Sequence, residues 1–420
     1  MIATPAGAQA IAVAERLLRP EIVLAAVPGP EGASLAHGLA GTALLHARLA
    51  TVDPTFAAAA GLHWAAAASH ARRHHATSAG IFASGGGLAA SLIIGTGYLP
   101  DPAARQESVG RATRWLSRQA ERIADDLAQR RRVGDPYARR RVYDAISGLA
   151  GIGRVLLAAT TVGQPAAEPG LLAALRALVT MIETPQRSRP GWWLPAFMHP
   201  PTTKADPSGS AATGMAHGIA GPLAFLAIAR AYGWTVPGQY AAIRHASQWL
   251  LDWKVAGTYQ WSTSVSGDEL DAGAARSLTG RQDAWCYGTP GISAALDLAS
   301  QALGDDGLAQ VSDCAIASLA SRPVSTWDAD GPALCHGHAG VLQCAASRHS
   351  SVAAQAADAI TAAFDASRPF AIPHTDNGTI GDRPGFLTGA VGAALALAEH
   401  DRRLPSPTVP ARWDCVLLLS

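Results

Sequence analysis

The sequence has little charge, few cysteines and no long apolar run, and each shortage excludes a class of protein. Charged residues make up 15% of the 420 residues, below the roughly 25% of an average soluble domain, whereas 49% are hydrophobic. This composition favours an extensive core and little disorder. A formal net charge of +1 provides no basic surface for nucleic acid, so nucleic-acid binding is not predicted.

The cysteines are few and odd in number, which disfavours a disulfide framework and favours a reducing cytoplasm. They are Cys286, Cys314, Cys335, Cys344 and Cys415. Residues 1–20 lack the basic start and the continuous apolar core of a signal peptide. Later apolar stretches are interrupted by charge before the ~18 residues of a membrane span. We therefore expect a cytoplasmic protein without a transmembrane segment.

The alternation of apolar and polar residues that marks half-buried strands is also missing, and a repeat takes its place. Seven Gly-x-x-Gly segments, each followed by an apolar run, occur roughly 50 to 70 residues apart, which is room for two helices per unit. In the second copy, Ala90 is taken to replace the second glycine. The first glycines of the copies are Gly38, Gly87, Gly148, Gly218, Gly288, Gly337 and Gly389.

Helices of a second kind are expected between these segments. The stretches 111–130 and 239–257 each have one apolar stripe and one polar face, whereas the glycine-started runs are apolar on nearly every side. Seven buried helices alternating with seven amphipathic ones predict two concentric rings. The predicted fold class is all-α, in a single domain over residues 1–420.

Several chemically active side chains share a position in the repeat. Cys286 and Cys335 lie two residues before a first glycine, His217, Tyr287 and His336 lie one residue before, and Asp144 lies four before. His37 occupies the same position as His217 in the first copy, but no role is assigned to it. If the inner helices surround one axis, these residues meet at one end of the ring.

Two thiols and one imidazole, from Cys286, Cys335 and His336, are a donor set suited to zinc. Three protein ligands leave one position open, whereas structural sites normally close with four. His338 would point elsewhere once the helix has begun, and Cys344 lies two turns along it. Cys344, Cys314 and Cys415 are interpreted as small buried hydrophobic residues. We expect one Zn²⁺ per chain.

These motifs carry a family resemblance that runs from about residue 34 to the C-terminus. The segments DAWCYGTPGI and LCHGHAGVL, within the sevenfold repeat and with YDAISGLAGIGR, GMAHGIAG and the terminal WDCVLLL, resemble the lanthionine synthetase C-like family. The stand-alone cyclases of lanthipeptide (lantibiotic) biosynthesis are the most similar members. The resemblance implies an α,α-toroid of seven inner and seven outer helices, in agreement with the repeat.

The resemblance also implies a reaction, in which a peptide cysteine thiol adds to dehydroalanine or dehydrobutyrine in the same precursor. His217 matches the family's acid or base, and Asp144 matches a second site position that would orient it. Tyr287 would bond the enolate or line the pocket. Each also has a plain structural interpretation, as a helix cap or a packing residue. The family has an arginine where this sequence has Gln282, with Arg281 one residue earlier.

The resemblance further implies partners: a dehydrated precursor peptide with its leader and a separate dehydratase, with room for peripheral assembly on a membrane-associated complex. The basic run Arg130–Arg141 is either a leader site or a solvated face. In the long loop 188–214, Trp192 and Trp193 either line the substrate or pin the loop. Three alternatives stay open: a glutathione-binding or glutathione-adding member of the superfamily, a non-catalytic zinc-stabilised scaffold, and, with a poorer motif fit, a thiol prenyltransferase.

Overall fold

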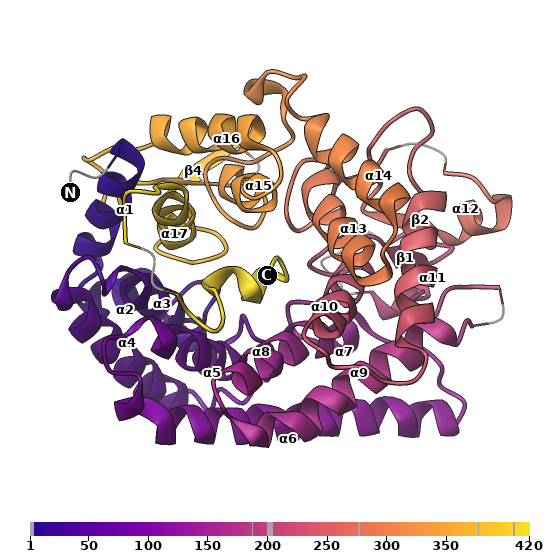
Figure 1. The fold of residues 1–420 in the computed structure, drawn as a ribbon, viewed down its shortest axis with the longest axis horizontal. Helices are drawn as coiled ribbons and strands as arrows, with labels where there is room; N and C mark the ends of the chain where they lie inside the picture. Colours follow the sequence, from indigo (N-terminus) through magenta and orange to yellow (C-terminus); the bar gives the residue numbers. More distant parts are fainter. Residues whose placement is uncertain (1–3, 187, 200–204, 276–277, 377, 406–407) are drawn as a thin grey trace.

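The computed structural model describes residues 4–186, 188–199, 205–275, 278–376, 378–405 and 408–420. Within these residues, seven helices form a closed inner ring, in which each helix packs against the next and the last packs against the first (Figure 1). All seven are mostly buried. They are α3 (Leu39–Leu49), α5 (Ser84–Gly95), α8 (Leu149–Thr161), α10 (Ala220–Ala231), α13 (Thr289–Leu303), α15 (His338–Ala345) and α17 (Ala390–His400).

Seven further helices of the described chain pack outside the ring, each mainly against one inner helix. Six of them follow their inner partner in sequence, whereas α1, near the start of the chain, covers α17, near its end. The two concentric rings predicted from the repeat are therefore present. The outer helices are α1 (Pro5–Arg16), α4 (Pro54–Arg73), α6 (Gln106–Arg132), α9 (Glu168–Glu183), α11 (Gln239–Asp252), α14 (Asp306–Ala317) and α16 (Ser350–Ala362).

One helical stretch of the described chain, Pro165–Glu183, is long and apolar enough to cross a membrane by length and composition. Half of its apolar window is buried, because α9 packs against both α6 and α8 in the ring. A buried helix of a folded ring passes the same test, so the stretch is weak evidence for a span.

The connections at the two ends of the ring differ in length. Connections from an inner to the next outer helix are short: 50–53, 96–105, 162–167, 232–238, 304–305 and 346–349. Connections into the inner helices are mostly longer and hold the short α-helices and the strands of the described chain. They are 17–38, 74–83, 133–148, 184–219, 253–288, 318–337 and 363–389. One end of the ring is therefore built of loops, and every predicted site residue lies at that end.

The short elements in these loops include three helices and two pairs of strands. Strands β1 and β2 pair antiparallel, with Ser210 opposite Ser266, and β3 and β4 form a hairpin, with Thr375 opposite Ile380. Each strand has three residues, too few to produce the alternation that a sequence search detects. The elements are α2 (Pro20–Ala26), α7 (Arg140–Tyr143), α12 (Gly267–Ala272), β1 (Ser210–Ala212), β2 (Ser264–Ser266), β3 (His374–Asp376) and β4 (Thr379–Gly381).

The second glycine of each copy packs against the carbonyl oxygen six residues earlier, where a Cβ would be in close contact. In the second copy this glycine is Gly87, which faces the carbonyl of Ile81, and α5 begins at Ser84. The predicted register of this copy was therefore wrong by three residues. Ser84 replaces the first glycine, whereas Ala90 lies within the helix.

Candidate metal centre and active site

Backbone hydrogen bonds join the turns that precede the inner helices. At six of the seven junctions in the described chain, an N–H of one turn donates to a carbonyl of the next at 2.9–3.1 Å. The donor and acceptor pairs are Ala36 and Phe82, Ala145 and Ala216, Ala216 and Cys286, Cys286 and Cys335, Cys335 and Leu387, and Leu387 and Ala36. Because Cys286 and Cys335 hold the same place in adjacent copies, this circuit sets them side by side.

The glycine after this turn is needed for its shape. Gly288, which follows Cys286 and Tyr287, has a φ of 97°, in the region that favours glycine. A Cβ there would also overlap the carbonyl of Gln282. The sharp turn that presents Cys286 therefore depends on a residue without a side chain.

The two thiols affect each other's protonation. The hydrogen bond from Cys335, helped by His336, holds the pKa of Cys286 well below the usual range of a thiol, against the effect of burial. The same contact and burial raise the pKa of Cys335 well above that range. The first proton leaves this pair easily and the second does not. A cation between the sulfur atoms would favour loss of the second proton as well.

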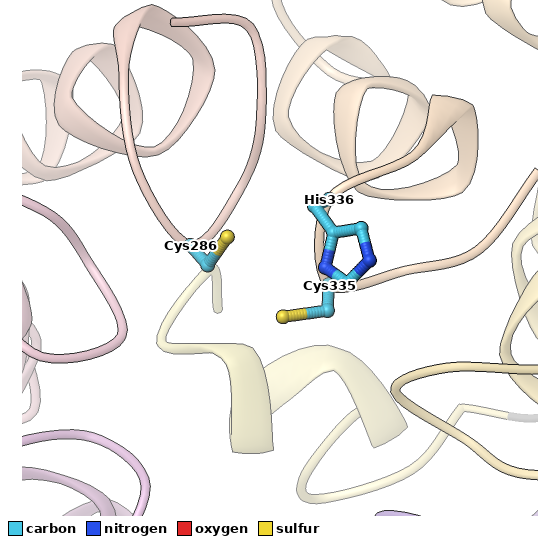
Figure 2. A group of neighbouring side chains, drawn as sticks. All are labelled: Cys286, Cys335 and His336. Carbon is cyan, nitrogen blue, oxygen red and sulfur yellow. The ribbon is translucent and has the colours of Figure 1, made fainter. Parts of the chain in front are cut away.

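His336 completes the cluster, in which both sulfur atoms and one ring nitrogen lie within 4.8 Å of one another. Figure 2 shows one nitrogen of its ring directed toward the sulfur atoms and the other directed away. Nε2 is buried and has no hydrogen-bond partner in the described chain. Two coupled thiols and an imidazole in this arrangement fit zinc, which prefers sulfur and nitrogen ligands.

The rival ligands lie elsewhere. His338 packs beside Trp327, with ring centroids 6.2 Å apart, and it belongs to no ligand group found in the described chain. Burial raises the pKa of Cys344 to about 12 and that of Cys415 to about 11, so both thiols stay protonated. Cys314 is half-buried on the outer helix α14.

His217 and Asp144 form a close pair at the same end of the ring. Nδ1 of His217 lies 2.6 Å from Oδ2 of Asp144, and the carboxylate is 2% exposed, whereas the imidazole is 37% exposed. The other oxygen of Asp144 accepts from the N–H groups of Ser147 and Gly148 at the start of α8. An ionised carboxylate only accepts hydrogen bonds, so Nδ1 carries the proton and Nε2 is the acceptor nitrogen.

Tyr287 lies near both this pair and the cysteine cluster. Its ring centroid is 6.4 Å from that of His217, and it directly follows Cys286 in the chain. Burial raises the pKa of its hydroxyl to about 12, although the charge of Arg140 acts in the opposite direction. The phenol therefore stays neutral and able to donate a hydrogen bond at any physiological pH.

The contacts of Gln282 and Arg281 show which of the two brings charge to the position where the family has an arginine. The side-chain amide of Gln282 donates to the carbonyls of Thr279 and Gly280 within its own loop. Arg281 instead approaches Asp328 at 3.3 Å and Asp330 at 3.6 Å. Its charge helps to lower the pKa of Cys286 and opposes the rise in the pKa of Cys335, so Arg281, rather than Gln282, brings positive charge to the cluster.

The tryptophans of the loop 188–214 anchor it to the ring. Trp192 is buried edge-on against Trp249 of α11, with centroids 5.0 Å apart. Trp193 packs against Tyr137 at 5.9 Å and under the guanidinium of Arg189 at 5.7 Å. These contacts favour the pinning role over a substrate wall. Residues 200–204 of this loop lie outside the described residues.

The basic run Arg130–Arg141 divides into two parts. Arg130 pairs with Asp126 on α6 at 2.8 Å, and Arg132 bonds Gln129, as expected of a solvated helix face. Arg140, in α7, lies closer to the site: it contacts His199 at 3.4 Å and has no carboxylate partner in the described chain. Leader binding by this run stays a prediction.

Three residues near the cluster were not found from the sequence. The ring of His374 faces that of His336 with centroids 6.0 Å apart, and Asp330 and Asp376 carry carboxylates within 4.8 Å of a ring nitrogen of His336. They come from the loops 318–337 and 363–389, outside the repeated segments. The DNG triplet at 376–378, which is typical of a hairpin turn, is the signal that would have located the hairpin.

Comparisons with known proteins bear on the family and the fold of the chain. The chain matches the sequence model of the lanthionine synthetase C-like protein family over residues 29–417. The nisin biosynthesis protein NisC of Lactococcus lactis subsp. lactis is 25% identical over 202 residues, which are 46% of this chain and 46% of that protein. The alignment thus spans about half of that relative. The solved structure of nisin cyclase, at 18% identity, has a TM-score of 0.78 over 97% of this chain and 96% of that chain, which establishes the shared toroid fold.

Proposed function

The chain belongs to the lanthionine synthetase C-like family, and from this premise we propose that it is a cytoplasmic, zinc-dependent lanthipeptide cyclase. A cysteine thiol of a dehydrated precursor peptide adds to a dehydroalanine or dehydrobutyrine of the same peptide. The S–H bond breaks, an S–C bond forms at the β-carbon and the α-carbon gains a proton. The observation that carries this proposal is the His217–Asp144 pair at the same end of the ring as the Cys286, Cys335 and His336 cluster.

We assign one zinc ion to Cys286, Cys335 and His336. A group of three ligands is typical of sites that keep a position for an exchangeable ligand. Zinc bound there would lower the pKa of a peptide thiol, which is otherwise mostly protonated at neutral pH. Arg281 adds positive charge beside the same sulfur atoms.

The protein's own side chains would handle the protons. Asp144 holds the Nδ1 proton of His217, which leaves Nε2 to accept the thiol proton and to return a proton to the α-carbon. The phenol of Tyr287 stays protonated and would donate to the enolate oxygen. Arg140 places an uncompensated charge near that phenol. We propose that these groups replace the charge that Gln282 does not supply.

The proposal also names partners. The substrate is a dehydrated precursor peptide with its leader, and a separate dehydratase prepares it. The loop-built end of the ring would receive the peptide. Peripheral assembly with a membrane-associated complex is a further part of this proposal.

The test uses a dehydrated precursor peptide and thiol alkylation followed by mass spectrometry, because cyclisation itself leaves the mass unchanged. We expect alkylatable thiols to disappear with the wild type and to persist with Cys335→Ala. Elemental analysis is expected to find about one zinc per chain in the wild type and none in that variant. Persistent thiols with a zinc-loaded wild type would contradict the cyclase.

The alternatives give different results in the same assay. A protein that adds glutathione would increase the mass of the peptide by one glutathione per reacted site when glutathione is present. A zinc-stabilised scaffold would bind zinc and leave both the thiols and the mass unchanged. His217→Ala separates the scaffold from the cyclase further, because loss of this imidazole would slow a cyclase and would change nothing measurable in a scaffold.

A further inference from the structure

The three-ligand cluster accounts for one ring nitrogen of His336 but gives no partner to the other nitrogen, which faces away from the cysteines. In Figure 2 the nitrogen next to the stem of the side chain, Nδ1, faces the sulfur atoms, and Nε2 faces away. Nε2 is buried without a hydrogen-bond partner in the described chain. A histidine that ligates a metal through one nitrogen needs an acceptor for the proton on the other, because that bond fixes the tautomer and the ring.

Two carboxylates lie close enough to supply the acceptor. Asp330 and Asp376 each place an oxygen within 4.8 Å of a ring nitrogen of His336. The side chain of Asp330 is 12% exposed, whereas Asp376 is exposed on the hairpin. A hydrogen bond to a buried acceptor competes less with water, which favours Asp330.

The backbone keeps Asp330 next to His336. The N–H of Asp330 donates to the carbonyl of His336 at 2.6 Å, and the N–H of His338 donates to the carbonyl of Gly331 at 2.8 Å. The two bonds close the turn that runs from Asp330 into α15. The backbones of Asp330 and His336 are therefore held together, which keeps the carboxylate and the ring within 4.8 Å of each other.

Arg281 fixes the other side of the carboxylate. Its Nη2 lies 3.6 Å from Oδ2 of Asp330, and its Nη1 lies 3.3 Å from both the carbonyl and Oδ1 of Asp328. The guanidinium is thereby held in place from two directions. Oδ2 of Asp330 faces this charge, and an ionised carboxylate has about four acceptor sites, so it can accept from more than one donor.

We propose that Asp330 is a positioning residue of the metal centre: its carboxylate accepts a hydrogen bond from Nε2 of His336 while Arg281 holds its second oxygen, so that Nδ1 presents its lone pair between the two cysteines. The inference rests on the proposed zinc site. It assigns Asp330 to the outer shell of that site. It also gives Arg281 a structural task, because the guanidinium orients the carboxylate that orients the ligand.

The test measures zinc affinity by competition with a chromophoric chelator, and the spectrum of the cobalt-substituted protein. Asp330→Ala is expected to weaken zinc binding about 10- to 100-fold, the usual cost of removing such a partner, with a changed cobalt spectrum. Asp330→Asn, which keeps an acceptor oxygen without the charge, is expected to lose less. Asp376→Asn is the matched control and is expected to bind zinc like the wild type.

Unchanged zinc affinity in Asp330→Ala would overturn the proposal, as would a loss in Asp376→Asn equal to that in Asp330→Ala. Two metal ions per wild-type chain, falling to one in Asp330→Ala, would also overturn it, because Asp330 would then be a ligand of a second ion. Circular dichroism of each variant separates misfolding from loss of affinity. Affinity is measured without peptide, so this result is independent of whether the protein cyclises anything.

Discussion

Asp144 connects the fold to the proposed chemistry through its two carboxylate oxygens. One oxygen accepts two N–H groups at the start of α8, and the other accepts from His217 at 2.6 Å. An asparagine keeps one acceptor oxygen for the helix but presents an NH₂ group that does not fix the imidazole tautomer. We expect Asp144→Asn to fold and to bind zinc, and to cyclise about 10²- to 10⁴-fold more slowly, the usual contribution of a general acid–base.

Initial rates of thiol loss on a dehydrated peptide, with zinc content measured on the same samples, test this expectation. Asp126→Asn on the solvated face of α6 is a suitable control, because its carboxylate pairs with Arg130 on the surface of that helix. Wild-type rates in Asp144→Asn would remove the pair from the mechanism. Loss of zinc together with the rate would show that the substitution disturbs the cluster as a whole.

Two buried histidines make the stability of the protein depend on pH. Nε2 of His46 donates to the carbonyl of Ala14, Nε2 of His63 donates to that of Leu18, and the rings lie 4.8 Å apart. Burial lowers the pKa of His46 from 6.5 to about 3 and that of His63 to about 4. The unfolded chain therefore binds these protons below about pH 6.5, whereas the folded protein binds them only near pH 3 to 4.

Protonation thus favours unfolding, and stability is expected to fall as the pH drops from 6.5 toward 4. The loss is up to about 1.4 kcal/mol per pH unit for each histidine. Thermal melts at several pH values measure it. His63→Gln is expected to melt lower at pH 7 but to lose less on acidification, whereas His245→Gln, at an exposed ion pair, should behave like the wild type. Equal acid sensitivity in His63→Gln and the wild type would contradict this explanation.

At the scale of the element, the start of each inner helix depends on a small residue. A Cβ on Gly392, in α17, would overlap the carbonyl oxygen of Phe386 and approach Leu334. Gly392→Ala is therefore expected to destabilise the protein by about 1–3 kcal/mol, the typical cost of overpacking, although alanine favours a helix. Gly381→Ala in β4, where no atom lies within 4 Å of the added Cβ, is the control.

Chemical denaturation of both glycine variants measures the difference. We expect a clear loss for Gly392→Ala and almost none for Gly381→Ala. A Gly392→Ala variant as stable as the wild type would mean that the turn before α17 shifts to accommodate the methyl group without lowering the free energy of unfolding. The close packing of the helix start against the carbonyl oxygen six residues earlier would then not explain why this glycine recurs in each copy.

The repeat explains how much of the site can be read from the sequence. Cys286 and Cys335 hold equal places in adjacent copies, so a closed ring of helices brings them together whatever the loops do. Asp330 and His374 belong to loops without a repeat, and their approach to His336 depends on turns that only the three-dimensional structure contains. In the second copy the three consecutive glycines, 85–87, left the register ambiguous, and only the contact of Gly87 with Ile81 resolves it.

On the scale of the whole molecule, the two ends of the described chain pack against the inner ring, one inside it and one outside it. The C-terminal turn η7 (Trp413–Leu417) lies within the ring (Figure 1), where the indole of Trp285 donates to the carbonyl of Leu417. Trp285 directly precedes Cys286, so this turn supports the segment that carries Cys286. At the other end of the sequence, α1 covers α17. The family match begins at residue 29, after α1.

We propose that the whole chain, residues 1–420, is one domain and that α1 is an integral part of it. The buried face of α1 packs against α17, Leu17 follows it fully buried, and the N–H of Thr4 donates to Asp401 at 2.9 Å. Leu17→Ala is therefore expected to cost about 2–5 kcal/mol, as for a leucine in any core. Glu15→Ala, on the exposed side of the same helix, should cost almost nothing.

Denaturation followed both by far-UV circular dichroism and by tryptophan fluorescence measures the loss of stability and shows whether it extends beyond α1. If α1 is integral, the two transitions shift together in Leu17→Ala, because opening the ring at α17 removes support from every neighbouring helix. A transition at the wild-type position would make α1 an appendage. So would a partial loss of the circular-dichroism signal, attributable to α1 alone, without a shift in fluorescence.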